Sequence, residues 1–338
     1  MSRSRVPRRL SRREMLALAR DPAPPGDDSG HWIRVARTAM ACRFEVTLSG
    51  EDARHVPAAR AALDAVDRIE DRLTVFRETS EVARVNREAA VGEAQASPPL
   101  FDLLVKCRTL HAESEGAFDP TSAPLSRCWG FLARQGRLPP AGDIEAARRR
   151  VGMDAVVLDP AARTVRFTRP EMELNFGAIG KGHALDLVAE LLRREGVPRA
   201  LVSAAGSSAV AFGGGDGFPV DVRSRRVDGV LARLRLREAA LGTSGAGEQY
   251  FEVEGRRYGH VLDPRTGWPA EGVLSVTVAT ADGASADALS TAFLVGGSDL
   301  AKRYCEAHPG TLAFVTPESE PARALRFGSC PGIEVDAG

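Results

Sequence analysis

The residue types and spacing around position 287 could hold a hard metal ion. Asp287 and Thr291 lie four residues apart in the stretch 286–295, whose pattern predicts a helix, so both side chains leave the same helix face. A carboxylate and a hydroxyl are hard oxygen donors of the kind that Mg²⁺ accepts. The alternative is structural: Ser285 caps the helix, and Asp287 complements the helix dipole in its first turn.

A glycine-rich turn near the middle of the chain could bind an anion. Gly177, Gly180 and Gly182 open a predicted helix. Glycines let backbone approach a ligand closely, and a helix N-terminus favours negative charge. Lys181 adds a compact ammonium, as one of only three lysines among 45 basic residues. A plain structural turn with a solvated lysine is the alternative. A Walker P-loop is excluded because Gly182, not Ser or Thr, follows the lysine.

Two Asp-Pro turns offer further candidate residues. His260 precedes Asp263-Pro264 by three residues and could act as a general base or contact phosphate. Asp263 could instead only initiate the turn, and a histidine that ends a strand could be structural. Asp119, before Pro120, has the same two interpretations.

The elements that position these residues are predicted from hydrophobic periodicity. Leu174 and Phe176 alternate with polar neighbours, which indicates a short half-buried strand that enters the glycine turn. The helix after the turn carries an apolar face formed by Ala184, Leu185, Val188, Leu191 and Leu192.

The rest of the chain alternates helices and hairpins, which predicts an α+β fold with antiparallel or mixed sheets. Predicted helices cover 58–73, a short stretch ending near 86, 98–115, 143–151 (with Asp143 as N-cap), 286–295 and 299–307. Predicted strands lie within 31–50 (interrupted at 40–43), 156–167 (a hairpin turned at 159–160), 200–203, 209–212, 218–223, 230–237, 239–243, 250–261, 274–279 and 312–315. The apolar loop 116–131 is expected to pack over another part of the protein.

Composition describes an ordinary soluble globular protein. The 338 residues are 43% hydrophobic and 27% charged, with a formal net charge of zero, which gives no electrostatic case for a nucleic-acid partner. Five scattered cysteines form no C-x-x-C pair, so neither a zinc site nor a disulfide framework is favoured, and a reducing compartment fits best.

The first 30 residues have a different character from the rest. Residues 1–30 are basic and carry Pro22-Ala-Pro-Pro25, and we expect a disordered tail. The twin-arginine-like stretch near residue 12 lacks the apolar run of a signal, and neither a lipobox nor a membrane span is present. We therefore expect a cytoplasmic protein, with export as the alternative. Residues 31–338 are expected to form one compact unit, with a division into two lobes as the alternative.

Five blocks in order resemble one family, the ApbE family of FAD:protein FMN transferases. The blocks span most of the chain, from about 37 to 297. They are Gly116-Ala-Phe-Asp-Pro-Thr121 followed by Trp129-Gly-Phe131, then Gly177-Ala-Ile-Gly-Lys-Gly-His-Ala-Leu-Asp186, Thr243-Ser-Gly245, His260-Val-Leu-Asp-Pro-Arg-Thr-Gly267, and Ala286-Asp-Ala-Leu-Ser-Thr-Ala292.

The resemblance implies a magnesium-dependent transferase. Such an enzyme cleaves the FAD pyrophosphate, passes FMN to a Thr or Ser hydroxyl in the flavinylation motif of an acceptor flavoprotein, and releases AMP. By the same resemblance, Asp287, Thr291 and the carbonyl of Ala178 would bind Mg²⁺. The implied FAD contacts are Met40, Phe76, Ala117, Phe118, Asp119, Asn175, Lys181 and Val261. His260 and Asp263 would lie near the reaction centre, and either could take the acceptor proton.

The chain departs from the family pattern mainly at flavin-contact positions. The family reads Met-Gly-Thr at Met40-Ala41-Cys42, Asp at Asn175, Gly-Gly-Asp at Ala205-Gly206-Ser207, alanine and tyrosine at Gly180 and His183, and a bulkier acidic-aromatic pair at Ala246-Gly247. The metal pair, Lys181 and His260 keep the pattern. Two alternatives stay open: an FAD pyrophosphatase that gives FMN and AMP, and a degenerate, non-catalytic flavin-binding homologue.

Overall fold

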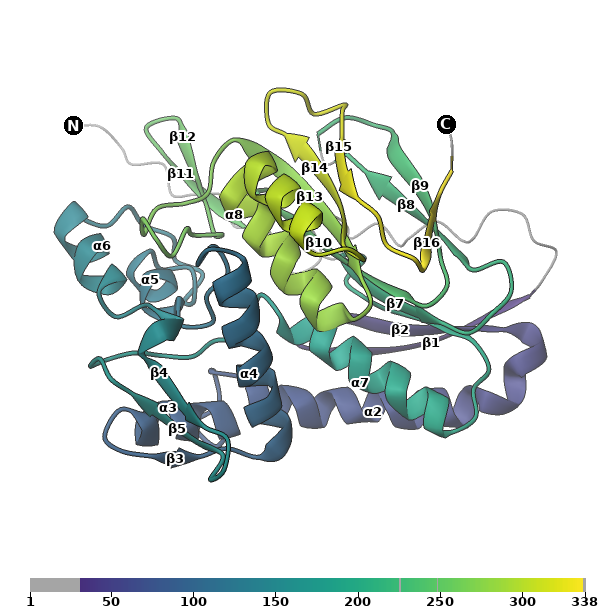
Figure 1. Cartoon of the computed structure of the whole chain (residues 1–338), viewed down its shortest axis with the longest axis horizontal. Coiled ribbons are helices and arrows are strands. Elements are labelled where there is room, and N and C mark those ends of the chain that lie inside the picture. The colour runs from purple at the N-terminus through teal and green to yellow at the C-terminus, as the bar shows by residue number, and fades with distance from the viewer. Residues whose placement is uncertain (1–30, 225, 248, 337–338) are drawn as a thin grey trace.

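The structure is a computed structural model that describes residues 31–224, 226–247 and 249–336 (Figure 1). The predicted tail, residues 1–30, lies outside the described residues, so its boundary stays a prediction. Helices and antiparallel sheets are interleaved along the chain, which confirms the predicted α+β class. Within the described ranges, no helix combines the length and apolar character needed to cross a bilayer.

An eight-stranded sheet forms the centre of the molecule, and every neighbouring pair in it is antiparallel. In spatial order its strands are β1 (Trp32–Ala39), β2 (Cys42–Ser49), β6 (Ala200–Ala204), β7 (Ser208–Phe212), β10 (Ala239–Gly245), β13 (Val273–Thr280), β14 (Leu312–Pro317) and β15 (Leu325–Gly328). Side chains alternate between the two faces, so Val276 and Val278 join one hydrophobic cluster while Ala279 joins another.

Helices cover one face of this sheet, and a small second sheet covers the other. The covering helices are α2 (Val56–Leu73), α7 (Gly180–Arg194) and α8 (Gly283–Ala307). On the opposite face lies the sheet β16 (Ile333–Val335), β9 (Val230–Leu236) and β8 (Phe218–Arg223). The apolar face predicted for α7 is confirmed, since Leu185, Val188 and Leu192 are fully buried. The helix layer brings the N-termini of α7 and α8 to one place.

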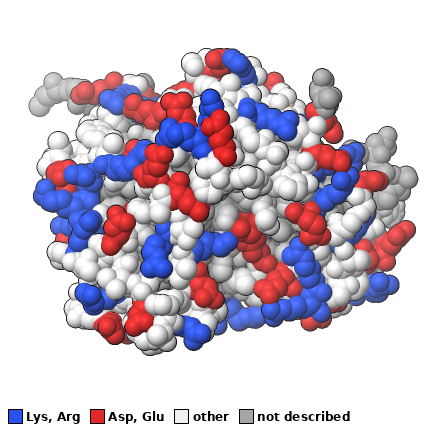
Figure 2. Space-filling view, viewed as in Figure 1, with Lys and Arg blue, Asp and Glu red and all other residues white. Residues whose placement is uncertain are grey.

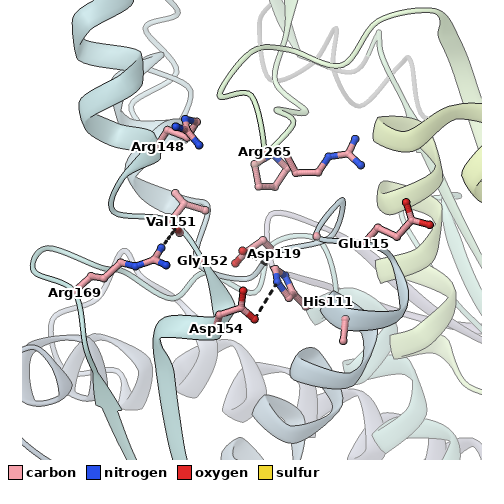
Figure 3. A pocket seen from close by; sticks show the side chains of 12 residues that line it. His111, Glu115, Asp119, Arg148, Val151, Gly152, Asp154, Arg169 and Arg265 are labelled. Atoms are coloured by element: carbon pink, nitrogen blue, oxygen red, sulfur yellow. Dashed lines mark hydrogen bonds and ion pairs between the residues drawn. The ribbon is translucent and has the colours of Figure 1, made fainter.

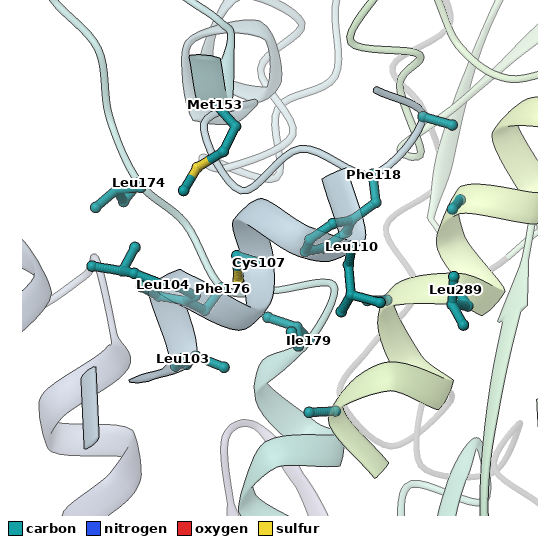
Figure 4. Close-up of a cluster of buried hydrophobic side chains, with 14 of the residues drawn as sticks. Leu103, Leu104, Cys107, Leu110, Phe118, Met153, Leu174, Phe176, Ile179 and Leu289 are labelled. Carbon is teal, nitrogen blue, oxygen red and sulfur yellow. The ribbon is translucent and has the colours of Figure 1, made fainter. Parts of the chain in front are cut away.

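A largely helical region packs beside the sheet through the same core. It contains α3 (Glu81–Ala89), α4 (Pro98–Glu113), α5 (Ala123–Cys128), α6 (Ala141–Arg148), η2 (Met153–Ala155) and the sheet β3 (Ala94–Gln95), β5 (Thr164–Phe167) and β4 (Val156–Asp159). The short helix η1 (Gly50–His55) is not part of this region, because it joins β2 to α2 and packs against them. The β4–β5 hairpin matches its prediction. Figure 4 shows Leu104, Cys107 and Leu110 of α4 near Phe176, Ile179 and Leu289. One hydrophobic cluster therefore joins α4, the glycine turn and α8.

The apolar loop 116–131 packs against another part of the protein, as predicted. Its partner is a hairpin, and the loop itself contains the short helix α5. Trp129 is fully buried and donates its indole N–H to the carbonyl of Gly267 at 2.9 Å. Its ring contacts Phe251 and Tyr258, which belong to the hairpin β11 (Tyr250–Val253) and β12 (Arg256–Gly259). This contact anchors the chain that leads from β12 to His260.

Several predicted boundaries and caps are corrected. Asp282, not Ser285, is the N-cap of α8, because its carboxylate accepts from the Ser285 N–H at 2.9 Å. Helix α6 begins at Ala141 with Pro140 as N-cap, so Asp143 lies in the first turn. The helices predicted at 286–295 and 299–307 are one element, α8, interrupted at Gly297, whose φ of 72° is non-helical.

The strand predicted at residues 174–176 is absent. Leu174 and Phe176 are buried as the alternation suggested, but the segment pairs with no strand. Its backbone is held by a side chain instead: the Leu174 N–H donates to Asn86 Oδ1 at 2.8 Å, and Asn86 Nδ2 donates to the Leu174 carbonyl at 3.1 Å. An amide side chain presents the same donor and acceptor as a backbone peptide, so it replaces a strand partner.

Charged side chains of both signs are interspersed over the face shown in Figure 2, without a large area of a single sign. This distribution agrees with the zero formal net charge of the chain.

Candidate active site

The Asp287 carboxylate joins α8 to the glycine turn. It is only 4% exposed; Oδ2 accepts from the Gly182 N–H at 2.7 Å, and Oδ1 accepts from Ser208 Oγ at 2.7 Å. A Cβ at Gly182 would overlap the carbonyl of Gly283, so only glycine permits this approach of α7 to α8. The purely local interpretation of Asp287, as a residue that complements the dipole of its own helix, is therefore incomplete.

The hydroxyl of Thr291 lies one turn along α8, beside strand β10. Thr291 Oγ1 is 3.0 Å from Ser244 Oγ and also donates to the Asp287 carbonyl at 3.3 Å. A Cβ at Gly242 would lie 2.5 Å from the Ala286 carbonyl carbon, which explains why β10 can approach α8 so closely. Ser208 and Ser244 each form a hydrogen bond with one residue of the predicted metal pair. Their spacing in the sequence gave no indication that they lie beside Asp287 and Thr291.

The turn itself brings a cation to the same carboxylate. Lys181 Nζ is 3.9 Å from Asp287 Oδ2, with 30% of the lysine side chain exposed. Ala178 is half-buried in the same turn and packs against the cluster beneath it. Cys42 directly follows the hairpin turn at Met40–Ala41. Burial is the main reason that the pKa of the Cys42 thiol rises to about 11, and the charges of Lys181 and Asp287 also act on this thiol. Three distant segments thus meet around Asp287.

One predicted contact residue, Asn175, connects two neighbouring loops. Asn175 Oδ1 accepts from the Gly177 N–H at 2.8 Å, and the Asn175 N–H donates to the Pro120 carbonyl at 2.7 Å. The glycine turn therefore lies directly beside the Phe118-Asp119-Pro120 loop. The side-chain bond, in which Asn175 Oδ1 accepts from Gly177, shows how an amide stabilises this turn.

Asp119 is buried within its own loop. Its Oδ1 accepts from the N–H of Thr121 at 2.7 Å and from Thr121 Oγ1 at 2.6 Å, and Oδ2 accepts from the Met153 N–H at 3.1 Å. His111 Nδ1 is 3.4 Å from the same Oδ2. Ala117 and Phe118 are 2% exposed. The structure therefore gives the Asp119 carboxylate a positioning task for loop 117–121.

His260 and Asp263 have different surroundings. His260 Nδ1 lies 3.1 Å from the Gln249 carbonyl, and its ring meets Phe131 edge-on. A carbonyl only accepts, so Nδ1 carries the hydrogen and Nε2 is the basic nitrogen. The Asp263 carboxylate accepts from Arg265 Nε and Nη2, both at 2.9 Å, and from the Arg265 N–H at 2.9 Å. These bonds give Asp263 a structural role in the turn, with its negative charge paired with the guanidinium of Arg265.

The remaining predicted FAD contacts are Met40, Phe76 and Val261. The Met40 N–H donates to Glu70 Oε2 at 2.6 Å, and the Phe76 side chain is exposed, with 73% of the residue surface accessible. Val261 is half-buried and packs against the cluster beneath the glycine turn. An exposed aromatic ring offers a stacking face to a planar ligand.

A polar cavity of about 420 Å³ lies beside Asp119 (Figure 3). It is lined by His111, Ala112, Glu115, Gly116, Asp119, Arg148, Val151, Gly152, Asp154, Arg169, Pro264 and Arg265. Arg148 and Arg265 are paired with Glu145 and Asp263, and Arg169 donates to the Val151 carbonyl at 2.8 Å. None of Lys181, His260, Asp287 and Thr291 lines this cavity.

Comparisons with known proteins agree with the fold and the order of the motifs. A family model described as the ApbE family matches residues 40–316. The chain is 26% identical over 294 residues to the FAD:protein FMN transferase of Escherichia coli (strain K12), covering 83% of each chain. That relative's name agrees with the prediction of a transferase.

Two solved structures show the same arrangement. The ApbE protein of Thermotoga maritima is similar with a TM-score of 0.80 and 28% identity, covering 88% of this chain and 97% of that chain. The apo flavinyl transferase ApbE of Pseudomonas stutzeri is similar with a TM-score of 0.77 and 29% identity, covering 88% and 95%. The chain therefore belongs to the ApbE family.

Proposed function

We propose that the protein is a magnesium-dependent FAD:protein FMN transferase. It cleaves the FAD pyrophosphate, transfers FMN to a Ser or Thr hydroxyl of an acceptor flavoprotein and releases AMP. The observation that carries the proposal is the contact of the buried Asp287 carboxylate with the N-terminal turn of α7, beside Lys181. A hard anionic oxygen, a helix N-terminus and an ammonium group suit a site where a metal ion and phosphates are bound together.

The residues fit Mg²⁺ rather than a softer ion. Each Asp287 oxygen accepts one hydrogen bond from the residues described above, and a carboxylate oxygen has capacity for a further interaction. The Thr291 hydroxyl and the Ala178 carbonyl would complete an all-oxygen protein set. Among the described residues, no cluster of three or more His, Cys, Asp or Glu side chains could hold a metal. Mg²⁺ usually has few protein ligands when substrate phosphates supply the others.

The bound ion would polarise the pyrophosphate and neutralise charge as AMP departs. Lys181 and the N-terminus of α7 would hold the phosphates in place. We assign the general base to His260, because Nε2 is its basic nitrogen while Asp263 is neutralised by Arg265. The predicted FAD contacts at Met40, Phe76, Ala117–Asp119, Asn175 and Val261 belong to the same proposal, and so does a cytoplasmic location.

The test is a flavinylation assay with a domain that carries a Ser/Thr acceptor motif. The purified protein is incubated with FAD, Mg²⁺ and this acceptor, which is then weighed by mass spectrometry. We expect an added FMN mass that is abolished by Asp287→Ala and kept by Asp299→Ala, an exposed position on the same helix.

Two other results would each contradict the proposal. Release of FMN and AMP without modification of the acceptor would identify an FAD pyrophosphatase. Intact FAD, with an acceptor that a known transferase modifies, would identify a non-catalytic homologue.

A further inference from the structure

The N-termini of α7 and α8 cap each other through two carboxylates. The N–H groups of Gly283 and Ala284, at the start of α8, donate to Asp186 Oδ1 at 2.6 Å and Oδ2 at 2.9 Å. In return, the Gly182 N–H of α7 donates to Asp287 Oδ2 at 2.7 Å. Each helix therefore supplies the acceptor for the unsatisfied N-terminal donors of the other.

The two halves of this contact have the same spacing. On α7, Gly182 precedes Asp186 by four residues, and on α8, Gly283 precedes Asp287 by four residues. A Cβ at Gly283 would lie 2.7 Å from the Gly182 carbonyl oxygen, so the glycines are the point where the helices meet. Residues four apart lie on one helix face, so each aspartate lies one turn beyond its glycine, facing the other helix.

Asp186 consequently determines where α8 begins relative to α7. Its two charge-assisted bonds hold the first turn of α8 beside the glycine turn, and Asp287 lies one turn further along the same rigid helix. A displacement of that first turn would move Asp287 away from Gly182 and Lys181. The bonds of Asp186 go to the Gly283 and Ala284 N–H groups, so its effect on Asp287 and Thr291 would travel through α8.

Other charged groups surround Asp186. Asp282, the N-cap of α8, is on the same side, and Lys106 of α4 donates to it at 2.7 Å. His183, one turn before Asp186, faces Lys106 and Asp282 as well, and its pKa is lowered to about 4, mainly by burial. Burial is also the main reason that the pKa of Asp186 rises to about 7; Asp282 raises it further, while the Gly283 and Ala284 N–H groups and Lys106 lower it.

We propose that Asp186 is a positioning residue for the metal site: by capping α8 from α7, it holds Asp287 and Thr291 in register with the glycine turn. This inference rests on the proposed metal site. It predicts that Asp186 sets the metal affinity of the protein, although Asp186 is not itself a ligand. Partners of ligating groups commonly change metal affinity by 10- to 100-fold.

The test is a titration with Mn²⁺ alone, followed by electron paramagnetic resonance, together with thermal unfolding. Asp186→Asn keeps the size of the side chain, but its amide N–H₂ must face one of the two N–H donors of α8. We expect Mn²⁺ binding at pH 8 to weaken about tenfold, with a melting temperature equal to or above that of the unsubstituted protein because a buried charge is removed.

The control is Glu190→Gln, an exposed position one turn further along α7, which should leave both measurements unchanged. Asp186→Glu keeps the charge but displaces it by one methylene, and it should also weaken Mn²⁺ binding; it carries the test if the asparagine variant does not fold. Lowering the pH from 8 to 6 should weaken Mn²⁺ binding less in Asp186→Asn than in the unsubstituted protein.

The outcomes separate this inference from the proposed function. If Asp287→Ala weakens Mn²⁺ binding but Asp186→Asn binds it like the unsubstituted protein, the positioning role is wrong and the metal site stands. A lower melting temperature with unchanged Mn²⁺ affinity would give Asp186 a purely structural role. If the unsubstituted protein binds Mn²⁺ no better than Asp287→Ala, the metal site itself is wrong, and the positioning role falls with it.

Discussion

Two residues beside the candidate site, Met40 and Ala41, depart from the usual backbone conformations of non-glycine residues. The hairpin between β1 and β2 turns at Met40 and Ala41, with φ values of 48° and 57°, and the register pairs Ala39 with Cys42. Two-residue turns of this kind favour glycine or asparagine because both central residues need positive φ. The sequence predicted an interruption here, but the strain at Ala41 could be recognised only from the backbone.

Replacing Ala41 with glycine should relieve this strain. We expect Ala41→Gly to raise the free energy of unfolding by roughly 0.5–1 kcal/mol, since the left-handed region costs alanine about 1–2 kcal/mol and the added flexibility of the unfolded chain offsets part of the gain. Chemical denaturation measures the change. The matched control is Ala61→Gly on the exposed side of α2, which should lower stability by about 1 kcal/mol; equal losses in both variants would contradict the explanation.

The two candidate bases should respond differently to substitution. His260→Ala should lower kcat by roughly 10²–10⁴-fold while the KM for FAD changes little, because a general base acts in the transition state. Asp263→Asn should keep most of kcat and lower the melting temperature, since its bonds to Arg265 organise the turn. Steady-state flavinylation kinetics and thermal unfolding measure both variants, and the reverse pattern would assign the base to Asp263.

At the scale of elements, hydrophobic periodicity predicted which residues are buried better than it predicted which segments pair as strands. Leu174 and Phe176 are buried as their alternation predicted, yet the segment between them joins no sheet. The backbone hydrogen bonds of Leu174 go to Asn86, 88 residues earlier in the chain, a partner that no local pattern can reveal. For the same reason, the sequence predicted the Asp287–Thr291 spacing but not Ser208 or Ser244, which reach the site from separate strands.

Asn86 should be required for the shape of the glycine turn. Asn86→Ala leaves the N–H and carbonyl of Leu174 without these partners, and we expect a loss of roughly 2–4 kcal/mol in unfolding free energy and a raised KM for FAD. Asn86→Asp is the matched variant, because it can accept from the Leu174 N–H but cannot donate to the carbonyl. It should have an intermediate stability, whereas two variants that unfold like the unsubstituted protein would exclude this role.

Two titratable groups on α7, His183 and Asp186, should have opposite effects on the pH dependence of stability. The pKa of His183 is lowered to about 4 by burial, so its unfolded form takes up a proton first and stability falls as the pH drops below about 6.5. The pKa of Asp186 is raised to about 7, so the folded form takes up the proton first and stability rises as the pH drops below 7.

Removing His183 should therefore expose the stabilising contribution of Asp186. Between pH 7 and pH 5, we expect His183→Gln to lose up to about 2 kcal/mol less unfolding free energy than the unsubstituted protein. Urea denaturation at the two pH values measures the difference. Identical pH dependence in both proteins would show that His183 does not stay neutral in the folded state.

At the scale of the whole molecule, the α+β class and most elements followed from the sequence, whereas their arrangement did not. The strands that carry Ser208, Ser244 and the turn at Met40–Ala41 belong to one antiparallel sheet, and α7 and α8 cover one face of it (Figure 1). Hydrophobic periodicity gives each element its buried face but contains no information on which faces meet. The order of the motifs identified the family, and the family rather than the periodicity indicated which residues assemble.

The strand order has a consequence for folding kinetics. Strands β2 and β6 are neighbours in the sheet, although about 150 residues separate them in the chain, and the whole helical region lies between them. Joining the ends of so long an intervening segment costs conformational entropy before any contact in the sheet repays it, so proteins with such distant pairings fold slowly. Of the segments around Asp287, the glycine turn precedes β6 in the chain, whereas β7, β10 and α8 follow it. Binding competence should therefore emerge as one of the last events of refolding, and fragments that end before β6 should never acquire it.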